Sequence, residues 1–122
     1  MKIYTTIAVD NGLCCTQAHL TEKGAIIHAI THLFVYSEIE SSKDLASFLT
    51  KSHAIMYRYL DQEESTTGII KALKEDITLN KPLDLSERSN KDLRILLKIL
   101  SDEIDYRDLG IMVKVDNSEL QL

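Results

Sequence analysis

Residues 42–60 show a spacing of apolar and polar positions that predicts two short helices, separated by a polar break at residues 50–52. Each helix places its apolar side chains on one stripe, with the i, i+3, i+4 spacing of an amphipathic helix. The stripes comprise Leu45, Ala46 and Leu49 in the first helix and Ile55, Met56, Tyr59 and Leu60 in the second. Ser52 can cap the second helix by accepting a hydrogen bond from a backbone N–H group. The pattern favours a helix-turn-helix, although two amphipathic helices of an ordinary helical domain would show it too.

The second of these helices leaves a polar side that suits contact with DNA. His53, Tyr57 and Arg58 lie off its apolar stripe, and such side chains can read base edges or touch phosphates in a major groove. We therefore expect residues 52–61 to act as a recognition helix, with nearby lysines holding the DNA backbone. The predicted DNA-binding residues are Lys43, Lys51, Ser52, His53, Tyr57, Arg58 and Lys71.

The flanking segments predict the remaining elements of a winged helix. A helix is expected over residues 20–30, and the apolar window 26–36 reads as a buried helix. Gly68 is expected to end the recognition helix. The wing would then comprise a strand that begins at Ile69-Ile70, an exposed loop over residues 74–81 and a returning strand at residues 83–85.

In this order of elements, residues 20–100 resemble the multiple-antibiotic-resistance-regulator (MarR) family and its winged-helix relatives. The residues that carry the resemblance are Leu20-Thr21 before the first core helix, Leu45-Ala46 in the next, Arg58 and Asp61 in the recognition helix, Ile69-Ile70 in the first wing strand, and Leu85-Ser86-Glu87 after the second. The resemblance implies a DNA-binding regulator that dimerises through terminal helices. The ends of this chain depart from that expectation.

Both ends of the chain read as strands. In residues 1–9 and 111–115, successive side chains fall on alternate sides of an extended backbone, as in a strand. Asp10-Asn11-Gly12 is a strong turn signal. Pairing the two strands would satisfy backbone groups that neither strand satisfies alone. The sequence leaves open whether they pair within one chain or across a dimer.

A further helix is expected from Ser89 or Asn90, either of which can cap it, to Ile104. Its apolar stripe comprises Leu93, Leu96, Leu97, Leu100 and Ile104, and Ile95 and Ile99 widen the apolar surface. Such a broad face fits either the core side of a well-buried helix or a dimer seam, and a dimer would suit a protein that reads two DNA half-sites.

Length and charge frame these expectations. The chain of 122 residues is long enough for one domain with a sizeable core. We expect an α+β, mainly helical fold over residues 1–122, with a winged helix-turn-helix core (20–88), an N-terminal strand and turn (1–19), and a C-terminal helix and strand (89–122). The net charge of −5 argues against a simple DNA binder. Residues 43–60 are the positive exception, with three basic residues and one acidic residue.

Candidate chemistry is sparse. His28 and His32 are four residues apart, a spacing that can place two ligands on one metal, but core or partly buried histidines are the favoured interpretation. The adjacent Cys14 and Cys15 would need a strained ring to form a disulfide, which favours free thiols in a reducing compartment. We expect no catalytic centre, metal or cofactor. No apolar run reaches membrane-spanning length and the first residues do not begin a signal peptide, so a cytoplasmic location is expected.

Two functions remain open at this point. The first is a small transcriptional regulator, expected to bind double-stranded DNA as a homodimer. The second is an acidic winged helix used for protein contact, for instance to modulate a transcription or replication factor.

Overall fold

The computed structural model describes residues 1–51, 63–107 and 110–119. Over these residues the fold is α+β, with four helices and one three-stranded antiparallel sheet. The elements in chain order are β1 (Lys2–Asp10), β2 (Leu13–His19), α1 (Glu22–Ser37), α2 (Ser42–Lys51), α4 (Glu63–Thr78), α5 (Asn90–Arg107) and β3 (Ile111–Glu119). The α+β class and its mainly helical character are as predicted.

The sheet has the strand order β2-β1-β3, so the N-terminal strand lies in the middle. β1 and β2 form a hairpin through Asn11 and Gly12, whose φ angles of 48° and 89° suit the two central positions of a type I′ turn. β1 also pairs antiparallel with β3, from Lys2 opposite Glu119 to Asp10 opposite Ile111. The two predicted terminal strands are therefore confirmed, and they pair within one chain.

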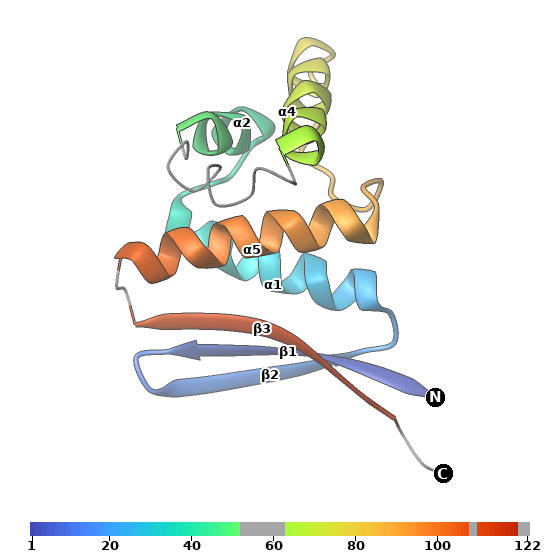
Figure 1. Ribbon diagram of the computed structural model, residues 1–122, viewed down its shortest axis with the longest axis vertical. Helices are drawn as coiled ribbons and strands as arrows, with labels where there is room; N and C mark the ends of the chain where they lie inside the picture. The colour runs from blue at the N-terminus through green and yellow to red at the C-terminus, as the bar shows by residue number, and fades with distance from the viewer. Residues whose placement is uncertain (52–62, 108–109, 120–122) are drawn as a thin grey trace.

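The molecule is layered (Figure 1). α1 and α5 cover one face of the sheet, and α2 and α4 form a further layer on the side of these helices away from the sheet. The core runs through all of these layers, because α1 and α5 place apolar side chains both toward the sheet and toward the layer of α2 and α4. Its largest fully buried side chains are Ile26, Ile30, Leu33, Leu45, Leu49, Leu93, Leu96, Ile99, Leu100 and Ile104.

Local signals explain where the central helices begin. Thr21 caps α1, with its hydroxyl accepting a hydrogen bond from the Gly24 N–H at 3.0 Å. Ser89 does the same for α5 through the Asp92 N–H at 3.1 Å, so Ser89 is the cap rather than Asn90. α1 ends at Glu38 in a left-handed conformation (φ 57°). The predicted helices at both places are confirmed, and α1 includes the apolar window 26–36.

The broad apolar face of α5 lies in the core of its own chain. Leu93, Leu96 and Leu100 are at most 2% exposed, and Ile95 and Ile99 are at most 5% exposed. The wider apolar surface is needed because α5 packs against α1 and the sheet on one side and against α4 on the other. The interpretation of this face as core is confirmed, and the dimer-seam alternative for it is wrong.

The predicted wing is wrong. Gly68, Ile69 and Ile70 lie inside α4 instead of ending a helix and starting a strand. Ile69 and Leu73 are both 4% exposed and share one helix face at the i, i+4 spacing, which a short apolar pair alone does not reveal.

The expected returning strand at 83–85 is irregular. The Asp84 carboxylate accepts hydrogen bonds from the Ser86 N–H at 2.9 Å and the Ser86 hydroxyl at 2.6 Å, which satisfies the backbone locally. With residues 69–70 in a helix, this segment has no neighbouring strand there with which to pair. The predicted first helix of the helix-turn-helix is present as α2, with Leu45, Ala46 and Leu49 buried. The predicted recognition helix at 52–61 falls outside the described residues.

Candidate functional site

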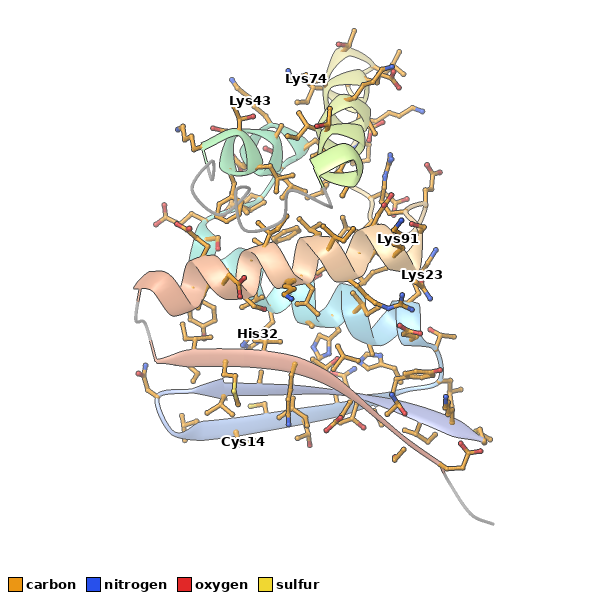
Figure 2. The ribbon with its side chains drawn as sticks, viewed as in Figure 1. Cys14, Lys23, His32, Lys43, Lys74 and Lys91 are labelled. Atoms are coloured by element: carbon orange, nitrogen blue, oxygen red, sulfur yellow. The ribbon has the colours of Figure 1, made fainter. Side chains whose placement is uncertain are left out.

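The predicted DNA-binding residues fall into two groups. Lys43 and Lys51 lie on α2 and Lys71 lies on α4, and all three side chains are exposed. Figure 2 shows Lys43 pointing outward from α2 at the end of the molecule away from the sheet. Ser52, His53, Tyr57 and Arg58 lie outside the described residues.

The start of α2 carries a fixed negative charge beside these lysines. The Asp44 carboxylate accepts a hydrogen bond from the Glu40 N–H at 3.0 Å, and the Asp44 N–H donates to the Ser41 hydroxyl at 3.2 Å. The bond from Glu40 and contact with Ser41 hold the pKa of Asp44 below its ordinary value. The carboxylate therefore stays ionised next to Lys43, which reduces the positive charge that this face offers to a phosphate.

A better-defined site lies between α5 and the sheet, where a cleft with a volume of about 400 Å³ opens. Three basic side chains from two elements line it: Lys2 of β1 and Arg94 and Lys98 of α5. Apolar or aromatic side chains line it as well: Tyr4, Ile26, Leu97, Val113 and Val115. Glu22 contributes a single carboxylate, and Ser101 and Asn117 contribute neutral polar groups.

The geometry of the elements explains how these residues meet. Alternation along β1 puts Lys2 and Tyr4 on the same side as the buried Thr6 and Ala8, which is the side that faces the helices. Arg94 and Lys98 are four residues apart, so they project from the same side of α5 one turn apart. The antiparallel pairing of β1 with β3 brings the end of the chain beside its beginning, which completes the cleft.

The cleft is electropositive in an acidic chain. Its three cations and one carboxylate leave an excess of two positive charges, whereas the whole chain has a net charge of −5. The guanidinium of Arg94 holds the carboxylate of Glu22, with Nη2 and Nε lying 2.5 Å and 2.6 Å from Oε1. Lys114 lies opposite Ile7, so its side chain is on the face of the sheet away from the helices, 3.8 Å from Asp116 on the same face. An anion with an apolar body would contact both the basic and the apolar side chains of this lining.

The sequence analysis did not find this cleft. Its basic residues come from positions 2, 94 and 98, and counting charge by segments assigns the last two to an acidic stretch. One signal was available, because Lys91, Arg94 and Lys98 recur at the i, i+3, i+7 spacing of a single helix face.

Three histidines, His19, His28 and His32, lie on β2 and α1. His19 of β2 and His28 of α1 approach each other, with Nε2 and Nδ1 3.1 Å apart. His32 lies one turn beyond His28 and its ring stacks at a tilt on Tyr36, with ring centroids 5.6 Å apart. Within the described part of the chain, no three His, Cys, Asp or Glu side chains gather as metal ligands would. Cys14 and Cys15 are free and exposed.

No model of a known protein family matches this chain, and no curated protein or solved structure is significantly similar to it. Among the described helices, none combines the length and the apolar character that crossing a membrane requires.

Proposed function

We propose that this protein binds a small anionic ligand with an apolar body in the cleft between α5 and the sheet. The observation that carries the proposal is the meeting of Lys2, Arg94 and Lys98 around one apolar hollow. These three basic side chains gather at one cavity although the chain has a net charge of −5.

The size and lining of the cleft support a small ligand. Small-molecule sites are concave, about 300–1,000 Å³ in volume, and mostly apolar with a few polar groups that orient the ligand. The cleft has about 400 Å³ and an apolar lining from Ile26, Leu97, Val113 and Val115. Burying part of the ligand among these side chains lowers the local dielectric, which strengthens its attraction to the cations.

The proposal is tested with 8-anilinonaphthalene-1-sulfonate, an anion with an aromatic body whose fluorescence rises on binding. Titration of the protein is expected to show one saturable site whose affinity falls with added salt. The double variant Lys2→Gln/Lys98→Gln is expected to lower the affinity about tenfold, since each lost charge contributes about 0.7 kcal/mol.

A matched control distinguishes the loss of charge in the cleft from a change in the net charge of the protein. Lys43→Gln/Lys74→Gln removes the same charge from α2 and α4, at the end of the molecule away from the sheet (Figure 2). This control is expected to leave the affinity of the probe nearly unchanged. Equal losses in both double variants, or no loss in either, would contradict an anion site in the cleft.

A second candidate function is DNA binding by α2 together with residues 52–61. The observation that favours it is the exposure of Lys43 and Lys51 on a helix whose opposite face is buried, directly before the segment that carries His53, Tyr57 and Arg58. On this proposal the two segments form a helix-turn-helix without the predicted wing strands. Arg58 would contact bases or phosphates, and Lys43, Lys51 and Lys71 would hold the DNA backbone. The adjacent free thiols of Cys14 and Cys15 suit the reducing cytoplasm in which such a regulator works.

This second candidate is tested by binding to duplex DNA at low and moderate salt. A steep loss of affinity with salt is expected for a DNA reader, and Arg58→Ala is expected to weaken binding at least about tenfold without lowering the melting temperature. If the protein does not bind DNA even at low salt, contact with another protein remains as the alternative function. Loss of DNA affinity in Lys2→Gln/Lys98→Gln, with none in Arg58→Ala, would place the phosphates in the cleft instead.

A further inference from the structure

The two edges of the sheet differ in charge. β2 forms one edge and β3 forms the other. Lys114, Asp116 and Glu119 place charged side chains along β3, and charged residues on an edge strand discourage another strand from pairing with it. Residues 11–21, which contain β2, include no Asp, Glu, Lys or Arg. β2 is therefore the edge without this protection.

β2 is also open on both of its faces. Its residues from Leu13 to Ala18 are all exposed, including Cys15 and Gln17, whose register with Ala8 and Thr6 puts them on the helix-facing side. Leu13 and Leu20, at the two ends of this segment, are each 75% exposed. The helices thus leave room for another strand beside β2.

The hairpin fixes which backbone groups of β2 face outward. In a two-residue hairpin the residues that flank the turn, here Asp10 and Leu13, form a hydrogen-bonded pair. Hydrogen-bonded and non-hydrogen-bonded pairs then alternate along the ladder. The residues of β2 in non-hydrogen-bonded pairs with β1 direct their N–H and C=O groups to the outer edge, and these are Cys14, Thr16 and Ala18.

We propose that β2 is the interface through which two copies of this chain form a homodimer, by antiparallel pairing of β2 with β2 of the second copy. The strand Leu13–His19 overlaps its copy completely when the two-fold axis passes beside Thr16. In this register Thr16 lies opposite Thr16, and Cys14 lies opposite Ala18, so all three outward-facing residues pair. The two sheets become one six-stranded sheet.

The second copy is the occupant that the symmetry and the lack of charge of this strand favour. Two chains of net charge −5 repel each other over most of their surfaces, and a charge-free strand is where they can meet with the least repulsion. An antiparallel strand pair about a two-fold axis is also self-complementary, because each copy presents the same residues to the other.

Sedimentation velocity over a range of protein concentrations tests the proposal, with dimer expected at twice the chain mass of 13.8 kDa. Thr16→Lys places two like charges opposite each other at the axis and is expected to raise the dissociation constant at least about tenfold. Ser118→Lys, at the β3 edge on the same face of the sheet, is the matched control and is expected to leave dimerisation unchanged. Because the interface holds no ion pair, added salt is expected to leave the dimer intact or to strengthen it.

A cross-link checks the register. Thr16→Cys in a Cys14→Ser/Cys15→Ser background is expected to form an intermolecular disulfide under mild oxidation, because Cα atoms of a hydrogen-bonded antiparallel pair lie about 5.5 Å apart. Met112→Cys in the same background, on the β3 edge, is expected to form none. A monomer at every concentration, a dimer broken by Ser118→Lys but not by Thr16→Lys, or cross-linking only at position 112 would overturn the proposal. A heterologous complex that competes for β2 while wild-type protein stays monomeric would overturn it as well.

Discussion

His19 and His28 join the edge strand β2 to helix α1, with Nε2 of His19 3.1 Å from Nδ1 of His28. One ring must donate and the other accept, so at least one of the two must be neutral. Burial lowers the pKa of His28 below 6.5, and the neighbouring His19 and His32 lower it further when they are charged.

The lowered pKa of His28 predicts a loss of stability in mild acid. The unfolded chain, with an ordinary histidine pKa of 6.5, takes up the proton before the folded chain does. The contribution of His28 is therefore present above that value and is lost as the pH falls through it toward the lower folded pKa. Urea unfolding at about pH 7.5 and about pH 5.5 should show a lower midpoint at the acid pH. His28→Gln, which cannot titrate, should show a smaller difference between the two, and an equal difference would contradict the prediction.

Tyr36 and Asp10 fasten the end of α1 to the end of β1. The Tyr36 hydroxyl donates to the Asp10 carboxylate, and this bond raises the pKa of the phenol above its ordinary value of 10.0. Tyr36→Phe should lower the free energy of unfolding by about 0.5–1 kcal/mol, because it removes one partly solvated hydrogen bond to a charged group. Tyr4→Phe is the control for loss of a hydroxyl, and chemical denaturation measures both. A Tyr36→Phe variant as stable as Tyr4→Phe would show that the bond contributes nothing.

The elements that the sequence predicted correctly have strong local signals. Alternation and a turn motif identified β1, and a cap followed by a long apolar stripe identified α5. The wing failed where the signal was short, because Ile69-Ile70 fits a strand start and a helix face equally well. Leu73, four residues after Ile69, distinguishes the two, because it continues the same buried face into a second helical turn.

The candidate cleft could not be predicted in the same way. It depends on β3 pairing beside β1, which brings Val113 and Val115 to the same side of the sheet as Lys2, across almost the whole length of the chain. The sequence predicted both strands but left open whether they pair within one chain. Without that pairing, Lys2 is an isolated charge, and Arg94 and Lys98 read as one face of a solvated helix.

The position of α5 in the core predicts large effects at some of its leucines. Leu100 is fully buried, so Leu100→Ala should lower the free energy of unfolding by about 2–5 kcal/mol through lost burial and the remaining cavity. Leu20→Ala, at a position that is 75% exposed, should change it by less than about 0.5 kcal/mol. Both values come from urea denaturation with two-state analysis. Similar small losses in the two variants would mean that α5 is not packed as described.

Glu22 gives the sharpest test of the cleft, because its removal should improve binding. The carboxylate occupies the guanidinium of Arg94 and opposes an incoming anion. Glu22→Gln keeps the size of the side chain, frees Arg94 and removes the single negative charge of the lining. One charge about 6 Å from a bound anion contributes roughly 0.7 kcal/mol in water and more in a partly buried site, so affinity for the sulfonate probe should rise about threefold or more.

The same substitution should barely affect folding, since Arg94 is 55% exposed and an exposed ion pair contributes under about 1 kcal/mol. Glu40→Gln removes one negative charge from the loop before α2 and serves as the control for net charge. Fluorescence titration of the three proteins at one salt concentration measures the effect. A rise in Glu22→Gln alone is the expected result. An equal rise in both variants would assign the effect to net charge, and weaker binding in Glu22→Gln would mean that the carboxylate holds Arg94 in the position that the ligand needs.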